Sequence, residues 1–144
     1  MQTATAIVKA DEQREEPLQR NAGDHQLRLR LSVRAERAIA LCDSLIDITA
    51  ALFGISSREL RQIGPARPCL EVARIRQLAM YVAHVTLRLS MKDVGIGFGR
   101  DRTTVTHACH LIEDLRDDIE FDRMVVMTEK IASAAFRNHL EMLR

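Results

Sequence analysis

Short polar and basic side chains gather at the start of a helix that the sequence predicts from Asp101 onward. Asp101 has the residue type of an N-cap and would accept backbone N–H bonds from Thr103 or Thr104. Helical spacing separates the rest into two faces. The inward face holds Val105, Ala108, Cys109, Ile112 and Leu115, and the outward face holds Thr103, Thr106, His107 and His110.

The outward side chains match the chemistry of double-stranded DNA. Threonine hydroxyls bond base edges or phosphates, and their methyls meet the thymine methyl. Arg100 and Arg102 stand at the predicted N-terminus, where backbone N–H groups and the helix dipole also attract phosphate. The far end of the helix is acidic (Glu113, Asp114, Asp117 and Asp118). We therefore expect DNA to meet the N-terminal end alone.

A second short helix precedes this one. Ser90 is its predicted N-cap, with Asp93 at the capping-box spacing. We expect Met91, Val94 and Phe98 on its buried side, Gly95 to allow close approach to a neighbour, and Gly97-Phe98-Gly99 to end it. Two helices joined by a short glycine-containing turn have the outline of a helix-turn-helix.

Earlier segments must support this motif. An apolar stripe from Leu27 to Phe53 predicts a long helix ended by Gly54, and Ser56 or Ser57 is placed to cap a short helix. A basic loop follows at 64–68. The next predicted helix turns one face inward (Ile75, Leu78, Ala79, Val82, Thr86 and Leu89) and presents a polar stripe (Arg74, Gln77, Tyr81, His84 and Arg88). A last helix from Ile119, with Met124, Met127, Ile131 and Ala135 on one face, is expected to pack on the long first helix or to mediate self-association.

Composition favours an all-α fold. The 144 residues include six Gly, three Pro and no Trp, so long stretches are uninterrupted and the core must be aliphatic. We expect residues 1–25 to be disordered, 26–118 to form a helix-turn-helix domain, and 119–144 to form the added C-terminal helix. The net charge is only +1, but residues 58–110 carry an excess of five positive charges and residues 111–122 an excess of five negative charges. A focused basic site is typical of a nucleic-acid binder.

Other classes of protein lack support in the residues. Three cysteines without C-x-x-C spacing indicate reduced thiols, and His107-Ala-Cys-His110 has no partner cluster to complete a zinc site. No G-x-S-x-G, H-E-x-x-H or G-x-x-x-x-G-K-[ST] motif occurs. We expect no enzyme activity, no cofactor, no metal and no nucleotide. The absence of an apolar run predicts no membrane association and a cytoplasmic, nucleoid-associated protein.

The run Met91-Lys-Asp-Val-Gly-Ile-Gly-Phe-Gly-Arg-Asp-Arg-Thr-Thr-Val-Thr-His-Ala-Cys109 resembles the signature of the C-terminal DNA-binding domain of the bacterial replication initiator DnaA. Arg76-Gln-Leu-Ala-Met-Tyr81 resembles the segment that precedes it in that family. The similarity covers about 35–117. It implies an all-helical fold related to Trp-repressor-like proteins, here as a stand-alone domain without the ATPase module.

The resemblance also implies roles for particular residues. Asp101, Arg102, Thr103 and Thr104 occupy the positions of the family's major-groove base contacts. His107, Arg76 and Gln77 match its backbone contacts, and we add His84 on the same stripe. Two positions depart from the family: Arg102 replaces a His, and Pro68 falls where a minor-groove Arg is expected, with Arg67 one residue away. Because Arg pairs bidentately with guanine, the base preference is expected to shift.

These observations predict sequence-specific binding to double-stranded DNA by a transcriptional regulator or a modulator of replication initiation that recognises DnaA-box-like sites. The alternative is a degenerate domain that acts as a protein–protein interaction module. The apolar face of the last helix and the near-zero net charge favour that alternative, which includes a homodimer through this helix.

Overall fold

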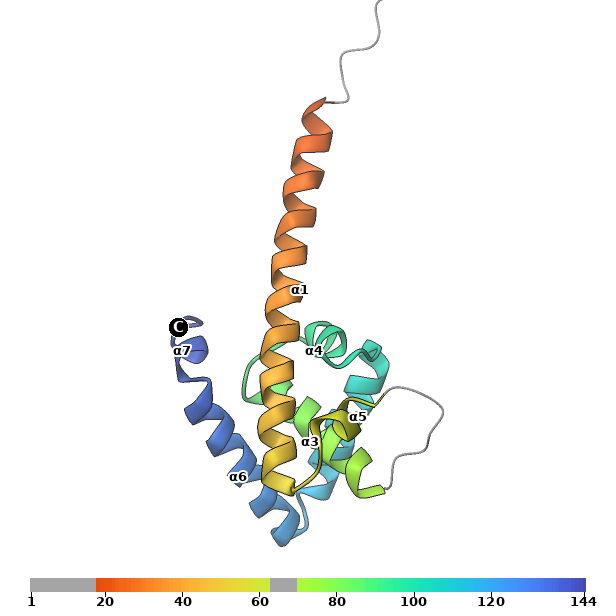
Figure 1. Ribbon diagram of the computed structural model, residues 1–144, viewed down its shortest axis with the longest axis vertical. Coiled ribbons are helices and arrows are strands. Elements are labelled where there is room, and N and C mark those ends of the chain that lie inside the picture. The colour runs from red at the N-terminus through yellow and green to blue at the C-terminus, as the bar shows by residue number, and fades with distance from the viewer. Residues whose placement is uncertain (1–17, 63–69) are drawn as a thin grey trace, which may run out of the picture. The chain divides into compact units, whose positions relative to one another are not determined.

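The computed structural model describes residues 18–62 and 70–144, which are helical throughout apart from short turns (Figure 1). The helices are α1 (Leu18–Phe53), α2 (Ser57–Arg61), α3 (Leu70–Val85), α4 (Met91–Phe98), α5 (Arg102–Leu115), α6 (Ile119–Ala135) and α7 (Arg137–Glu141). No strand occurs in the described ranges, which confirms the predicted all-α class. None of the helices described is both long enough and apolar enough to cross a membrane.

The chain divides into two units, residues 1–34 and residues 35–144. Of the segment predicted to be disordered, 1–17 lies outside the described residues, whereas α1 is already helical from Leu18. At its other end α1 stops where predicted, because Gly54 adopts φ +67° and allows Ile55 N to donate to Ala50 O at 3.0 Å. Ser56 then caps α2 in a complete capping box with Glu59.

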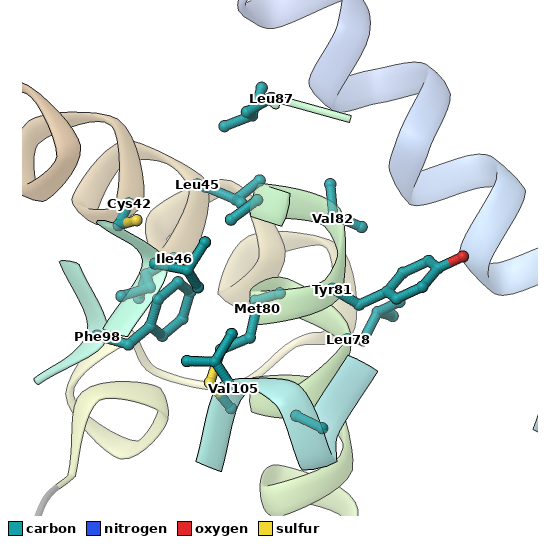
Figure 2. Packing of buried hydrophobic residues seen from close by; sticks show 14 of the residues in the cluster. Cys42, Leu45, Ile46, Leu78, Met80, Tyr81, Val82, Leu87, Phe98 and Val105 are labelled. Atoms are coloured by element: carbon teal, nitrogen blue, oxygen red, sulfur yellow. The ribbon is translucent and has the colours of Figure 1, made fainter. Parts of the chain in front are cut away.

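The core of residues 35–144 surrounds α3. Helices α2, α4, α5 and α6 all pack against it, and Figure 2 shows side chains of α1, α3, α4 and α5 meeting in one aliphatic cluster. The largest fully buried side chains come from this cluster (Tyr81, Leu45, Ile46, Leu60, Leu78, Met80, Leu87 and Ile112). A helix surrounded in this way is apolar on nearly all sides.

Two features of α3 differ from the sequence prediction. Tyr81, placed on a polar stripe, is 2% exposed and belongs to the core. The helix also ends at Val85, so Thr86, Arg88 and Leu89 lie in the following turn rather than on its faces. The turn is made by Arg88 in the left-handed region, at φ 59°. A non-glycine residue in that conformation carries no local signal of a helix end.

The inward face of α6 is also different from the predicted one. Val125, Thr128 and Ala132 are buried, whereas Met124 and Met127 remain 37% and 42% exposed. The helix packs on α3 and ends at Ala135, and Phe136 separates it from α7. Of the face predicted to pack inward, Met124, Met127 and Ala135 are exposed, and Ile131 is half-buried.

Helices α1 and α4 approach closely at Gly97. A Cβ atom on this residue would overlap the Sγ of Cys42 and would lie 2.5 Å from its Cβ and 3.1 Å from Ala38 O. Gly97 was predicted to end the helix with Gly99, but it lies inside α4 and the helix ends at Gly99. Its role is to let the helix-turn-helix dock on α1.

We predict that Gly97→Ala lowers the free energy of unfolding by about 1–3 kcal/mol, measured by urea denaturation, because the added methyl overpacks the contact with Cys42. The helix propensity of alanine would by itself stabilise the protein by up to ~1 kcal/mol. Ile96→Ala, at the exposed neighbouring position, is the control. An unchanged or increased stability of Gly97→Ala would show that α1 and α4 do not meet here.

Candidate nucleic-acid interface

Helices α4 and α5 form the predicted helix-turn-helix. Ser90 caps α4 by accepting from Asp93 N at 3.1 Å, and Gly99 ends it with φ 64°. The chain then crosses directly over Gly95, where Arg100 N donates to Gly95 O at 2.8 Å. A Cβ on Gly95 would lie 2.7 Å from Arg100 O, so only glycine permits this approach.

Helix α5 has the two faces expected from its sequence. Val105, Ala108, Cys109 and Ile112 are buried, and Leu115 packs partly buried against the same core. Burial raises the pKa of the Cys109 thiol to about 11, so this cysteine is an inert core residue. The outer face is exposed at Asp101, Arg102, Thr103, Thr104, His107 and His110.

The first residues of α5 are held by Asp101. Its carboxylate accepts from Thr104 N at 2.7 Å, and hydrogen bonds from the Thr104 backbone and hydroxyl and from Thr103 N lower the pKa of this carboxyl. The side chain is fully exposed, so water screens the interaction. The cap leaves further lone pairs on the carboxylate free to accept from a ligand.

Arg76 lies inside the protein, in contrast to the surface position expected of a phosphate contact. It is 7% exposed, and its Nε and Nη2 donate to Leu60 O at 2.7 Å and Glu59 O at 3.0 Å. Burial and the neighbouring Arg100 lower its pKa. The guanidinium therefore bonds two C-terminal carbonyls of α2, that of Leu60 and that of Glu59, which also accepts from Gln62 N at 3.3 Å.

Arg100 reaches the same end of α2. Its Nη2 donates to Gln62 O at 2.7 Å. Its Nε is buried and has no hydrogen-bond partner, and it is the single such side-chain atom among the residues that the structure describes. The half-buried side chain thus links the turn before α5 to the residue that follows α2.

The remaining predicted site residues come from earlier parts of the chain, and those that the structure describes are less exposed than the start of α5. Gln77 is half-buried and accepts from Arg74 at 3.2 Å. His84 is also half-buried, and its Nδ1 lies 2.8 Å from Leu89 O, across the turn between α3 and α4. Arg67 falls in 63–69, outside the described residues. Asp101, Arg102, Thr103 and Thr104 are contiguous and exposed, and His107 follows one turn later.

A polar network that sequence reasoning missed anchors α6 behind the far end of α5. Tyr81 donates to Glu113 Oε1 at 2.8 Å and accepts from Arg116 at 3.0 Å, while Arg116 also pairs with Asp122 at 2.6 Å and Glu129 at 3.2 Å. Burial disfavours the charge of Arg116, but its hydrogen bonds outweigh that effect and raise its pKa. These partners are far apart in sequence, so no local pattern indicated them.

Within residues 18–62 and 70–144, no group of three or more His, Cys, Asp or Glu side chains could hold a metal ion. His107 and His110 both face outward from α5.

Comparison with known proteins agrees with this geometry. Residues 42–112 match the family described as bacterial dnaA protein helix-turn-helix. The chain is 33% identical over 105 residues to the chromosomal replication initiator protein DnaA of Rickettsia canadensis, Rickettsia massiliae and Rickettsia rickettsii. Each alignment covers 72% of this chain and 22% of the relative, so the chain spans about a fifth of their length.

The matched residues run from α1 to the inward face of α5, which includes the whole of the turn over Gly95. This segment of the chain is thus a DNA-binding helix-turn-helix domain of the bacterial DnaA family.

Proposed function

We propose that this protein binds double-stranded DNA in a sequence-specific manner and inserts the N-terminal end of α5 into the major groove. The observation that carries the proposal is the run Asp101, Arg102, Thr103 and Thr104, four consecutive exposed residues at the start of a helix whose opposite face is fixed in the core. In a helix-turn-helix, the first residues of the second helix contact base edges.

Each of these side chains suits a different base contact. The Asp101 carboxylate is held in place by its cap and accepts from the cytosine amino group. Arg102 is exposed and offers two parallel donors to guanine O6 and N7. Thr103 and Thr104 present methyls for thymine. Arg102, where relatives of the family carry His, shifts preference toward guanine.

His107, one turn further along the exposed face, is the proposed phosphate contact of α5. Gln77 and His84 are half-buried and offer further polar contacts to the DNA backbone, and Arg67 is proposed for the minor groove. Arg76 is also proposed to affect binding to the DNA backbone. Its donors Nε and Nη2 already bond carbonyl groups within the protein.

The proposed role is that of a transcriptional regulator or a modulator of replication initiation at DnaA-box-like sites. The relatives named as chromosomal replication initiators support that role. A domain of this kind acts by occupying sites rather than by catalysing a reaction. We place it with DNA in the cytoplasm, at the nucleoid.

We predict that Thr103→Ala combined with Thr104→Ala weakens binding to a site selected from random duplexes by about tenfold or more, because each good base contact contributes about 1–3 kcal/mol of discrimination. Affinity for a scrambled duplex should change little. The matched control is Thr106→Ala, whose hydroxyl already bonds Arg102 O at 2.9 Å within α5. Equal losses on selected and scrambled duplexes would contradict base readout by these threonines.

Asp101 allows a pH test of the N-cap. Because its pKa in the folded protein is lowered, the stability that its charge contributes is present above the unfolded value of 3.8 and is lost as the pH falls through the folded value. We predict that the Tm of the wild type exceeds that of Asp101→Ala at about pH 7 and that this difference shrinks below about pH 4. Asp101→Asn should retain the cap without this pH dependence. A constant difference between wild type and Asp101→Ala across that range would contradict the charged cap.

A second candidate function is self-association through α6, as part of an interaction module. Met124 and Met127 are exposed on α6, whereas Val125 and Ala132 of the same helix are buried. Methionine faces are common at adaptable protein surfaces. A dimer would also present two helix-turn-helix units to paired half-sites.

Removal of residues 119–144 is not a clean test, because Val125 and Ala132 belong to the core. We predict instead that a dimer formed through this face dissociates at least tenfold more readily in Met124→Glu with Met127→Glu, measured by sedimentation equilibrium, since charges buried in an interface are costly. Glu120→Gln, on an exposed position of the same helix, is the control. A wild type that sediments as a monomer excludes self-association through this face. So does a dimer that the double Met→Glu variant leaves intact.

A further inference from the structure

Arg100 connects three elements that meet at the start of α5. Its backbone N–H donates to Gly95 O of α4 at 2.8 Å, and its side chain donates to Gln62 O beyond α2 at 2.7 Å. The next residue, Asp101, is the N-cap of α5. One residue therefore fixes where α5 begins relative to both α4 and α2.

One donor of the Arg100 side chain is buried without a partner. Its Nε has no partner and is shielded from water, and it lies beside Arg76, a second guanidinium. A buried donor without a partner carries a desolvation penalty, so its retention calls for an explanation. The carbonyl groups at the end of α2 supply the compensating contacts: Arg76 binds those of Glu59 and Leu60, and Arg100 binds that of Gln62.

We propose that Arg100 is a positioning residue for DNA recognition, which holds the N-terminal end of α5 against the end of α2, and that it does not act as a phosphate contact. The proposal rests on the proposed function, because the end that it positions is the one assigned to base readout. The two arginines at this turn therefore have different roles: Arg102 faces the DNA, and Arg100 faces the protein.

The geometry separates the two arginines. The Nε of Arg100 is inaccessible and its Nη2 donates to the Gln62 carbonyl, so the side-on pairing through Nε and Nη2 is closed to a phosphate. Arg102 is exposed at the first position of α5. It can approach DNA without changing the fold.

The test compares Arg100→Met with Arg102→Met in the full chain. Both changes remove one positive charge and keep an unbranched side chain. The dissociation constants for a selected duplex and a scrambled duplex are measured across a range of salt concentrations. For Arg100→Met we expect selected-site affinity to fall about tenfold, the size of one lost charged hydrogen bond. Scrambled-duplex affinity should change less than about twofold, with an unchanged salt slope.

A phosphate contact predicts a different result. Loss of one contact lowers the magnitude of the salt slope by about 0.9 and weakens both duplexes in parallel. That outcome for Arg100→Met would overturn the proposal, as would binding equal to wild type on both duplexes. Arg102→Met shows the slope change for a charge lost from the exposed side of the same turn.

Arg100→Lys gives a rescue that retains the charge and one donor within reach of the Gln62 carbonyl. We expect it to recover most of the preference for the selected duplex. If Arg100→Met is unfolded at room temperature, Arg100→Gln, which also removes the charge, takes its place. A folded Arg100→Gln that weakens both duplexes in parallel, or that binds both as the wild type does, overturns the positioning role.

A measurement without DNA separates this inference from the proposed function. In Arg100→Met we expect amide hydrogen exchange to accelerate at Gly99–Asp101 and at Leu60–Gln62, with α6 unchanged. If the wild type prefers no duplex but this pattern appears, the proposed function fails and the structural link holds. If exchange at Gly99–Asp101 and at Leu60–Gln62 is unchanged, Arg100 does not link these two segments, even where specific DNA binding is intact.

Discussion

The close approach of the Arg100 backbone to Gly95 is the constraint on which the interface depends. The hydrogen bond from Arg100 N to Gly95 O turns the chain within three residues of the end of α4, and a side chain at Gly95 would occupy the space of Arg100 O. The turn fixes where α5 starts, and burial of its inward face against α3 and α4 fixes how it is rotated. Together they present Asp101 to Thr104 to solvent as a rigid set, which reduces the conformational entropy lost on binding.

Charge gives this surface a direction. The start of α5 combines the positive end of a helix dipole with Arg102, whereas its far end carries Glu113, Asp114 and the acidic turn into α6. Part of that negative charge is engaged within the protein, because Glu113 accepts from Tyr81, which in turn accepts from Arg116. Only the N-terminal end of α5 is therefore electrostatically compatible with a phosphate backbone.

Local signals predicted much of this fold. Gly54, Ser90 and Asp101 were identified from residue type alone, because each acts on a backbone group within a few positions of itself. The cap of α2 was narrowed to Ser56 or Ser57, and the end of α4 to Gly97–Gly99. Features that depend on distant neighbours were not predictable in this way. The burial of Tyr81 follows from α5 and α6 closing over α3, and Arg76 is drawn inward by the carbonyls of α2. Periodicity also gave the wrong side of α6, since alternative apolar stripes were available and tertiary packing selects Val125 and Ala132. Within the site, exposure of Thr103, His107 and His110 followed from the pattern, whereas the inward direction of Arg100 did not.

Amide chemical-shift mapping with a duplex selected from a random pool tests the central claim most directly, because it locates the DNA on the protein. The account predicts that the largest changes fall on Asp101, Arg102, Thr103 and Thr104, with small changes along α6 and at the acidic end of α5. Changes centred on α6, or spread evenly without a maximum at the start of α5, would contradict it.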